Sequence, residues 1–492
     1  MTSPLVRQDI WTLEQPSTWH PVTLAYARAI RVMQERAASD PTSWAYQASV
    51  HEIPREENPG DTEDPWRGQC QHQSWFFLPW HRLYLAHFER IIRLIVKDLP
   101  DVPVEVREGW ALPYWDYARG GPTDGLPPAF RSPQLPDGSA NPLFVPARDD
   151  HINQGWGLPP QAVSAQRAMQ ETEFSEPAGR PSGFGGSVTS WHHAGAGGVP
   201  GALEVTPHNI VHGLVGGTDA SGEPGFMGSF DRAPLDPVFW LHHCNIDRLW
   251  VIWRGQGKDP SEITWLDKDF YFHDEAGTPL KVSPRDAVDT IANLGYTYEN
   301  LAPPAVETRR VQRMAARSRS DEPPELAGAT DRSVELTGRQ ADVAFPLEVP
   351  ARIQERRSGT AESAAPPTRI FLRVEEIQGD RNPGIGYAVY VDPPGDPSEA
   401  DAYYAGNVSF FGIEVASDTR RDHPGGHGLQ FAFDVTDVVE QLESEGRWDL
   451  SSVTVSFVPL RPVPPPGAEH APEAAEERTS PVRIGRVSFF YQ

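Results

Sequence analysis

The spacing of apolar residues divides the chain into a helical first part and a β-rich last part. Before residue 300, apolar side chains recur every three or four positions, the period of a helix with one buried face. Two predicted helices have clear start signals, because Thr206-Pro207 and Asp236-Pro237 each place a capping side chain before a proline. The pattern predicts helices at 22–36, 80–97, 207–215 and 237–253.

After residue 331 the pattern changes to alternating apolar and polar positions. Seven short segments of this kind, separated by turn residues, continue to the C-terminus and predict an antiparallel β-sandwich or barrel. The stretch between the two parts is charged, poor in aromatic residues and rich in proline near its ends, which is typical of a linker. Residues 306–318 within it also fit a solvated helix. We therefore expect a first domain over 1–302, a linker over 303–330 and a β-domain over 331–492.

Composition narrows the classes of partner. The 492 residues carry a net charge of −25, which disfavours nucleic acid and anionic membrane surfaces as partners. No apolar run reaches the length of a membrane span. The N-terminal residues lack a basic region followed by an apolar one, so we expect a cytoplasmic location, with export by a helper protein as the alternative. Two cysteines in the whole chain exclude a disulfide-based scaffold.

Six of the sixteen histidines fall into two sets with spacing typical of metal ligands. His208 and His212 lie four apart on a predicted helix, so both point from one face. Imidazole is a ligand that suits copper, zinc, iron and nickel. The two sets are His51, His72 and His81, and His208, His212 and His243.

The pattern excludes two other kinds of metal site. In the segment HNIVH, Asn209 stands where a zinc protease needs a glutamate as its base. A di-iron carboxylate site needs Glu-x-x-His pairs on two helices, and the sequence has none. A site made only of imidazoles carries no ligand charge, and it can hold copper in both of its common oxidation states. The histidine sets therefore favour a copper centre that exchanges electrons with O2.

Two stretches, QCQHQSWFFLPWHRLYLAHFER and MGSFDRAPLDPVFWLHHCNIDRLW, closely resemble the copper-binding regions of tyrosinases and catechol oxidases, the type 3 copper polyphenol oxidases. The shared motifs are His-x8-His followed by Arg, His-x3-His, and HH-x3-DR after DPVFW. The resemblance spans about 1–300 and implies a mainly α-helical catalytic domain, a four-helix bundle that holds a binuclear copper site. The tail resembles the C-terminal domain of plant-type latent polyphenol oxidases, which implies an all-β, sandwich-like lid over the active site.

The resemblance also assigns the ligands of two copper ions. The first copper would be bound by His51, His72 and His81, and the second by His208, His212 and His243. His242 would be a neighbour that does not bind copper. Cys70 matches the cysteine that fungal-type members join to the second ligand through a thioether; a plain buried cysteine is the alternative. Asp247 would accept a ligand's N–H or pair with Arg248, and Arg7 would pack near Tyr296 and Tyr298 in a structural role.

The activity implied is the oxidation of phenolic small molecules by O2, as o-hydroxylation of monophenols and oxidation of o-diphenols to o-quinones. Glu204 and Asn209 would orient a water that deprotonates a monophenol, since a phenol has a pKa near 10. An ordinary loop carboxylate and a helix-start residue are the alternatives for these two. Phe230 matches a bulky gate residue above the copper ions, where it would stack on the substrate ring or narrow the pocket.

Three other functions fit the same motifs. They are a catechol oxidase without monophenolase activity, an o-aminophenol oxidase, and a haemocyanin-like O2 carrier. The chain is one short unit without repeated copper domains, which argues against the carrier. The sequence does not indicate an oligomeric state.

Overall fold

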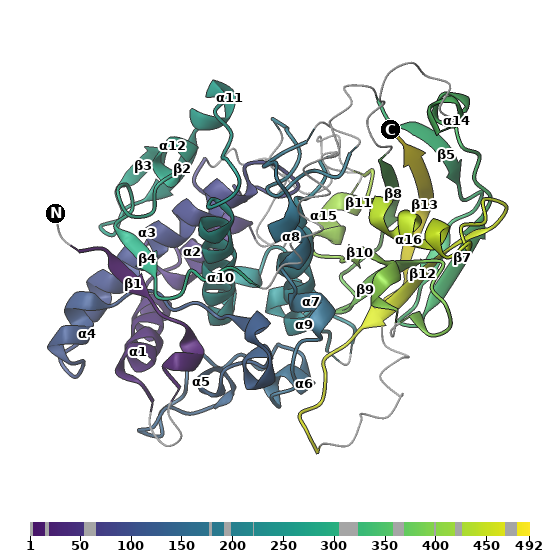
Figure 1. Cartoon of the computed structure of the whole chain (residues 1–492). Helices are drawn as coiled ribbons and strands as arrows, with labels where there is room; N and C mark the ends of the chain where they lie inside the picture. Colours follow the sequence, from purple (N-terminus) through teal and green to yellow (C-terminus); the bar gives the residue numbers. More distant parts are fainter. Residues whose placement is uncertain are drawn as a thin grey trace.

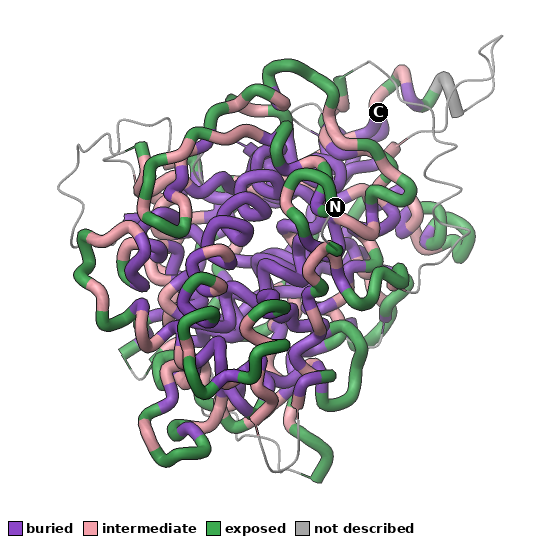
Figure 2. The backbone as a smooth tube through the Cα atoms, turned by 90° about the vertical axis from the view of Figure 1, so that its left-hand side faces the viewer, coloured by how far each residue is buried: buried purple, intermediate pink, exposed green. Residues whose placement is uncertain are grey.

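The computed structural model describes residues 3–14, 19–53, 65–176, 180–190, 198–219, 221–304, 323–357, 369–397, 400–418, 426–467 and 480–492. A helical domain and a β-domain lie side by side, joined along one flank of each (Figure 1). The fold class expected from the hydrophobic pattern is confirmed. Figure 2 shows the buried backbone concentrated in the interior, with exposed residues along the outer loops.

Five longer helices form the core of the first domain. α3 begins three residues before its predicted start, because Pro79 lies in the first turn, where a helix needs no backbone N–H. α10 begins as predicted, and the Asp236 carboxylate accepts the Val238 N–H at 3.0 Å. The helices are α1 (Pro21–Glu35), α2 (Trp44–His51), α3 (Phe77–Lys97), α9 (Ile210–Gly216) and α10 (Pro237–Trp253).

The predicted helix start at Pro207 is confirmed, but the predicted side-chain cap at Thr206 is wrong. A short helix, η4 (Glu204–Asn209), leads into α9 and is kinked at Thr206, whose backbone is extended (φ −145°, ψ 121°). The helix therefore starts anew at Pro207, and the Thr206 side chain makes no capping hydrogen bond within it. The Thr206 hydroxyl instead accepts a hydrogen bond from Asn407 of the β-domain at 3.1 Å. A contact between residues two hundred positions apart has replaced the local cap that the sequence indicates.

Short elements connect and cover these helices. β1 (Leu5–Arg7) pairs in parallel with β4 (Tyr296–Tyr298), and β2 (Phe270–His273) pairs with β3 (Pro279–Val282). The short helices are η1 (Ile10–Thr12), α4 (Val104–Gly109), η2 (Tyr117–Arg119), η3 (Gly121–Asp124), α5 (Pro128–Arg131), α6 (Asp150–Asn153), α7 (Pro160–Val163), α8 (Gln166–Gln170), η5 (Phe226–Gly228), η6 (Ala233–Leu235), α11 (Ile263–Leu266) and α12 (Pro284–Ala287).

The β-domain is a sandwich of two sheets. One has the strand order β10-β9-β12-β7; the other has the order β11-β8-β13-β5, with β6 also paired to β13. The strands are β5 (Glu325–Ala329), β6 (Val334–Leu336), β7 (Ala341–Phe345), β8 (Ile370–Gln378), β9 (Gly386–Val391), β10 (Tyr404–Val408), β11 (Leu429–Asp434), β12 (Val453–Leu460) and β13 (Val482–Tyr491). The helices are α14 (Ala351–Arg357), η8 (Asp401–Tyr403), α15 (Ile413–Ser417) and α16 (Thr436–Ser444).

Two predicted boundaries in this region are corrected. The predicted strand segment 332–349 is split into β6 and β7 at a turn where Gly338 has φ +87°, a conformation that favours glycine. Residues Glu325–Ala329 were predicted to belong to the linker because the neighbouring residues are charged. They instead form β5 and pair with β13. The rest of the predicted linker, 305–322, lies outside the described residues.

The two domains are joined through the segments that surround the histidines. Asn407 binds the Thr206 hydroxyl beside η4, and the Asn382 amide donates to the Gly228 carbonyl at 3.0 Å in η5. The apolar core of the helical domain also contains a β-domain side chain, Phe411. The β-domain therefore packs against the part of the helical domain that holds the candidate site.

A buried carboxylate, Asp247, ties α10 to α3 and to both terminal strands of the helical domain. It accepts hydrogen bonds from Tyr296 at 2.6 Å and from Tyr298, and it pairs with Arg82 and, at 3.4 Å, with Arg7. Burial opposes the charge on Asp247, but these cations and hydroxyls hold the pKa of its carboxyl below the usual value. Arg7 lies 3.6 Å over the Tyr296 ring, as the sequence predicted.

Arg248 is not the partner of Asp247. Its guanidinium pairs with Asp116 at 3.2 Å and donates to Asn245 Oδ1 at 3.0 Å. Adjacent helix positions point in different directions, about 100° apart, so neighbours in sequence do not face each other. The role of Asp247 is therefore to hold elements together.

We expect Asp247→Ala to destabilise the helical domain by about 3–5 kcal/mol, because it leaves the buried Arg82 guanidinium without its carboxylate and removes one of the two carboxylates that pair with Arg7. Thermal unfolding followed by circular dichroism measures the effect. Asp267→Ala is the matched control, since Asp267 pairs with Arg285 where both side chains are more than half exposed. Equal melting temperatures for the two variants would contradict this role for Asp247.

Candidate metal centre

Each of the six predicted ligands is placed by a helix or by a segment packed on one. His51 is the last residue of α2, and His81 lies one turn into α3. His72 precedes α3, next to Gln73, whose φ is +54°. All six side chains are buried. The second set comes from η4, α9 and α10, which carry His208, His212 and His243.

Five of the six rings present Nδ1 to an oxygen atom that can accept a hydrogen bond. Three acceptors are backbone carbonyls, and two are side-chain oxygens. The contacts are His51 to the Phe230 carbonyl (3.1 Å), His81 to the Phe77 carbonyl (2.9 Å), His212 to the Met227 carbonyl (2.8 Å), His72 to Glu204 Oε1 (3.0 Å) and His208 to Asn209 Oδ1 (2.8 Å). A neutral imidazole that donates from Nδ1 has its lone pair on Nε2.

These lone pairs meet in two groups. His51 Nε2 and His72 Nε2 are 3.2 Å apart, and His243 Nε2 is 3.3 Å from Nε2 of both His208 and His212. His81 Nε2 has no hydrogen-bond partner among the described residues. Two imidazoles that bind one ion at about 2.0–2.1 Å are about 3.3 Å apart at tetrahedral angles. The observed spacing is therefore that of rings sharing a cation.

Burial keeps the rings neutral, as metal binding requires. Loss of hydration lowers the pKa of His81, His208 and His243 well below the usual value, and nearby histidines lower it further. Burial also lowers the pKa of His212, to about 3. The two groups lie against each other, because the rings of His81 and His243 stack with centroids 4.4 Å apart. This arrangement could hold two neighbouring cations with no anionic ligand.

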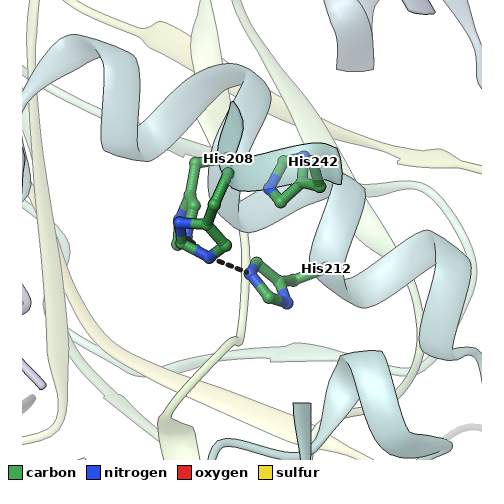
Figure 3. Close-up of side chains that lie close together, drawn as sticks. His208, His212 and His242 are labelled. Atoms are coloured by element: carbon green, nitrogen blue, oxygen red, sulfur yellow. Dashed lines mark hydrogen bonds between the residues drawn. The ribbon is translucent and has the colours of Figure 1, made fainter. Parts of the chain in front are cut away.

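The adjacent histidines of α10 have different surroundings. His243 presents Nε2 to the other two rings of its group, whereas His242 Nδ1 is 3.2 Å from the Tyr117 hydroxyl. Figure 3 shows His242 beside His208 and His212, close enough for its ring to belong to the same cluster. The two adjacent rings therefore differ in their contacts, and His243 is the one whose Nε2 faces both His208 and His212.

Glu204 and Asn209 lie at different histidines. The Glu204 carboxylate accepts the Gln73 N–H at 2.9 and 3.0 Å and contacts His72, whereas Asn209 contacts His208. Burial raises the pKa of Glu204 to about 8, against the effect of its backbone donors. Each residue thus orients one histidine, which sequence reasoning did not anticipate because Glu204 and His72 are 132 positions apart.

Phe230 lies over the first group. Its ring centroid is 5.0 Å from that of His72 and 5.4 Å from that of His51. Cys70 is buried, and its N–H donates to the His51 carbonyl at 3.0 Å, which places it beside the first group. Neither of the two cysteines of the chain forms a disulfide.

One residue of the site was missed because it comes from the β-domain. The Phe411 ring stacks on His212 with centroids 4.1 Å apart and planes inclined by 17°. It also lies 5.3 Å from Phe230, 5.8 Å from His72 and 5.9 Å from His208. The resemblance implied a lid over the active site, but no local signal in the sequence identifies which side chain of this domain enters it.

Comparisons with known proteins agree with this geometry. The common central domain of tyrosinase matches residues 41–256, and the polyphenol oxidase middle domain matches 259–311. A domain of unknown function matches 323–492. The tyrosinase HcTyr1 of Hahella sp. (strain CCB-MM4) is 31% identical over 98% of both chains. A chloroplastic polyphenol oxidase of Malus domestica is 28% identical over 88% of this chain and 72% of its own length.

Solved structures share the fold. The latent apple tyrosinase superposes with a TM-score of 0.61 at 23% identity, covering 100% of this chain and 97% of that one. A latent aurone synthase, also a polyphenol oxidase, gives a TM-score of 0.62 at 21% identity, covering 100% and 90%. The arrangement of a helical domain beside a β-domain is thus that of latent polyphenol oxidases.

The expected cytoplasmic location is contradicted by the comparisons. The relatives from Malus domestica, Prunus armeniaca and Larrea tridentata are named as chloroplastic, so they are targeted proteins. Among the described residues, no helix combines the length and the apolar character that a bilayer crossing needs.

The donor set, its neutrality and its spacing fit two copper ions, the cofactor of this family. The chain belongs to the tyrosinase and polyphenol oxidase family of binuclear copper oxidoreductases, which oxidise phenols with O2, and it carries the C-terminal domain of the plant-type latent members.

Proposed function

We propose that the protein is a latent tyrosinase, which hydroxylates monophenols at the ortho position and oxidises o-diphenols to o-quinones. The observation that carries this proposal is the pair of facing imidazole groups, in each of which one ring nitrogen of every histidine lies within 4.8 Å of those of the others. One copper would be bound by His51, His72 and His81, and the other by His208, His212 and His243. Bound copper supplies one-electron chemistry at two adjacent ions, which O2 reduction requires.

The protein's own residues would hold and orient the phenol. The Phe411 ring marks a space above His212 that an aromatic ring fills by stacking, an arrangement aromatic pairs prefer. Phe230 would close this space on the side of the first group. The surrounding core excludes water, which strengthens the electrostatic interactions of a bound phenolate.

The ligand assignment predicts a loss of copper. His208→Ala or His243→Ala should bind one copper per chain in place of two and lose nearly all activity, because each removes one of three donors. Metal analysis of purified protein measures the stoichiometry. His151→Ala, which changes a partly exposed histidine outside both groups, should keep both ions. Two coppers retained in both ligand variants would disprove the assignment.

Hydroxylation of monophenols is supported by a carboxylate and an amide next to opposite copper groups. The Glu204 and Asn209 side chains, both nearly fully buried, would together hold a water that takes the proton of an incoming monophenol. A diphenol needs this help less, because the first deprotonation of a catechol is easier.

Glu204→Gln or Asn209→Gly should therefore reduce the rate with tyrosine at least tenfold more than the rate with DOPA, the scale of a lost proton-transfer group. Steady-state kinetics on both substrates at fixed copper content measures the ratio. Glu223→Gln is the control, because Glu223 is exposed at the surface and pairs with Arg381. Parallel losses on the two substrates would mean that the pair only positions histidines.

A catechol oxidase is the second candidate, and one observation favours it. Both Glu204 oxygens accept the Gln73 N–H, and Asn209 Oδ1 contacts His208. The carboxylate and the amide oxygen therefore already have hydrogen-bond partners other than a water. A wild-type enzyme that oxidises DOPA but leaves every monophenol unchanged would establish this activity. An O2 carrier would leave both monophenols and added catechol unchanged. Product analysis with o-aminophenol as substrate tests whether the protein is an o-aminophenol oxidase.

We also propose that the β-domain, within the predicted range 331–492 and extended by β5, is a lid that keeps the enzyme latent. Its Phe411 occupies the space in which the substrate ring would stack. A tethered domain has a high effective concentration, so modest contacts suffice to keep it in place. The predicted linker arginines Arg309, Arg310, Arg313, Arg317 and Arg319 lie outside the described residues, and we expect trypsin to cut among them.

Phe411→Ala should raise the rate of catechol oxidation or lower KM, because it empties the stacking position without removing a copper ligand. Phe410→Ala is the matched control, since Phe410 is equally buried but packs in the core of the β-domain, where truncation costs about 3–5 kcal/mol. We expect Phe410→Ala to lower the melting temperature of the β-domain. Unchanged kinetics in a folded, copper-loaded Phe411→Ala protein would refute the role of Phe411 as a plug.

Cys70 would form a thioether with His72 in the copper-loaded enzyme. The step joins sulfur to a ring carbon and removes two hydrogen atoms, with O2 as the oxidant. A mass lower by two hydrogen atoms, absent in Cys70→Ser, is its signature; an unchanged mass after turnover would mean that Cys70 is a plain buried thiol.

A further inference from the structure

The second group contains a fourth imidazole, that of His242. One of its ring nitrogens lies within 4.8 Å of the donor atoms of the other three histidines. Its ring centroid is 4.9 Å from that of His212 and 5.3 Å from that of His208. Copper(II) accepts four nitrogen ligands readily, in tetragonal geometry. A catalytic metal, however, needs an open position for its substrates, so His242 has to be kept from the copper.

Tyr117 is the group that holds His242. It begins η2, more than a hundred positions before His242, and its hydroxyl is 3.2 Å from His242 Nδ1. The Tyr117 side chain is fully buried, and His242 Nδ1 is the acceptor that its hydroxyl contacts. A buried hydroxyl donates its proton to an acceptor within reach, so we take Tyr117 as the donor to His242.

This hydrogen bond leaves His242 without a free lone pair. The His242 ring is fully buried, and a neutral imidazole has one N–H and one lone pair. A hydrogen bond from Tyr117 occupies the lone pair on Nδ1 and places the ring proton on Nε2. Neither nitrogen can then bind a metal. His243, in contrast, directs Nε2 at His208 and His212.

We propose that Tyr117 is a positioning residue that keeps His242 off the second copper and so preserves the open coordination position used by the substrates. The hydrogen bond from Tyr117 and the position of His242 inside the imidazole cluster carry the proposal. It rests on the proposed function in one respect, the assignment of His243 as the third ligand.

Copper content tests the proposal directly. His243→Ala should bind one copper per chain, and Tyr117→Phe combined with His243→Ala should bind two, because His242 then has a free lone pair to replace the missing ligand. Adding His242→Ala to this double variant should reduce the content to one copper again. The matched control is Tyr26→Phe with His243→Ala, which removes another buried hydroxyl beside α10, one that donates to the Pro237 carbonyl at 3.0 Å. This control should remain at one copper.

The outcomes separate the two hypotheses. Two coppers in His243→Ala alone would overturn the ligand assignment of the proposed function. One copper in His243→Ala and still one in the double variant with Tyr117→Phe would overturn the role of Tyr117. If His243→Ala does not fold, His243→Gln, which fills more of the imidazole volume, takes its place in the same series.

The single variant Tyr117→Phe gives a second readout. An added ligand should slow the release of the second copper to a chelator by about tenfold, the scale on which residues around a metal change its affinity, while catechol oxidation falls. A purely structural role for the hydroxyl would loosen the copper and reduce activity together. Release that is faster than, or equal to, that of the wild type would overturn the proposal.

Discussion

The fixed direction of each buried imidazole is the constraint on which the rest of the structure depends. A neutral ring buried away from water must donate its one N–H, and in five of the six histidines an oxygen beside Nδ1 accepts it. The lone pairs of Nε2 then face inward, where a cation bound between the rings would satisfy them. Because the acceptors belong to α3, η4, η5 and the segment before η6, the helical core has to bring these segments together before any metal binds. The same rule explains His242, whose Nδ1 meets a hydroxyl donor in place of a carbonyl.

The β-domain is part of this construction, and as the proposed lid it would also limit access to the site. Its Phe411 completes the apolar core around the histidines, while Asn407 and Asn382 bind backbone and hydroxyl groups next to η4 and η5. A single aromatic side chain therefore stabilises the closed molecule and occupies the position in which a phenol would stack. Contacts that stabilise the interface between the domains would therefore reduce activity. Removal of the proposed lid would raise activity and would also remove the stabilising contacts of Phe411.

Local patterns in the sequence predicted much of the fold, and contacts between distant residues account for what they missed. The helices α1, α3 and α10 follow from apolar periodicity, and the Asp236 cap follows from its neighbour Pro237. The cap at Thr206 failed because Asn407, 201 positions away, takes the hydroxyl. β5 was missed because a short edge strand beside a charged segment has no periodic signal. The histidine spacing indicated the metal centre, but Phe411, Tyr117 and the contact of Glu204 with His72 depend on tertiary packing.

A crystal structure of the copper-loaded protein with anomalous scattering at the copper edge tests the central claim most directly. The account predicts two copper peaks, each bonded to three Nε2 atoms, one by His51, His72 and His81 and the other by His208, His212 and His243. It also predicts that the five Nδ1 contacts with oxygen persist in the loaded protein. A single copper peak, ligation through Nδ1, or a bond from His242 in the wild-type protein would contradict it.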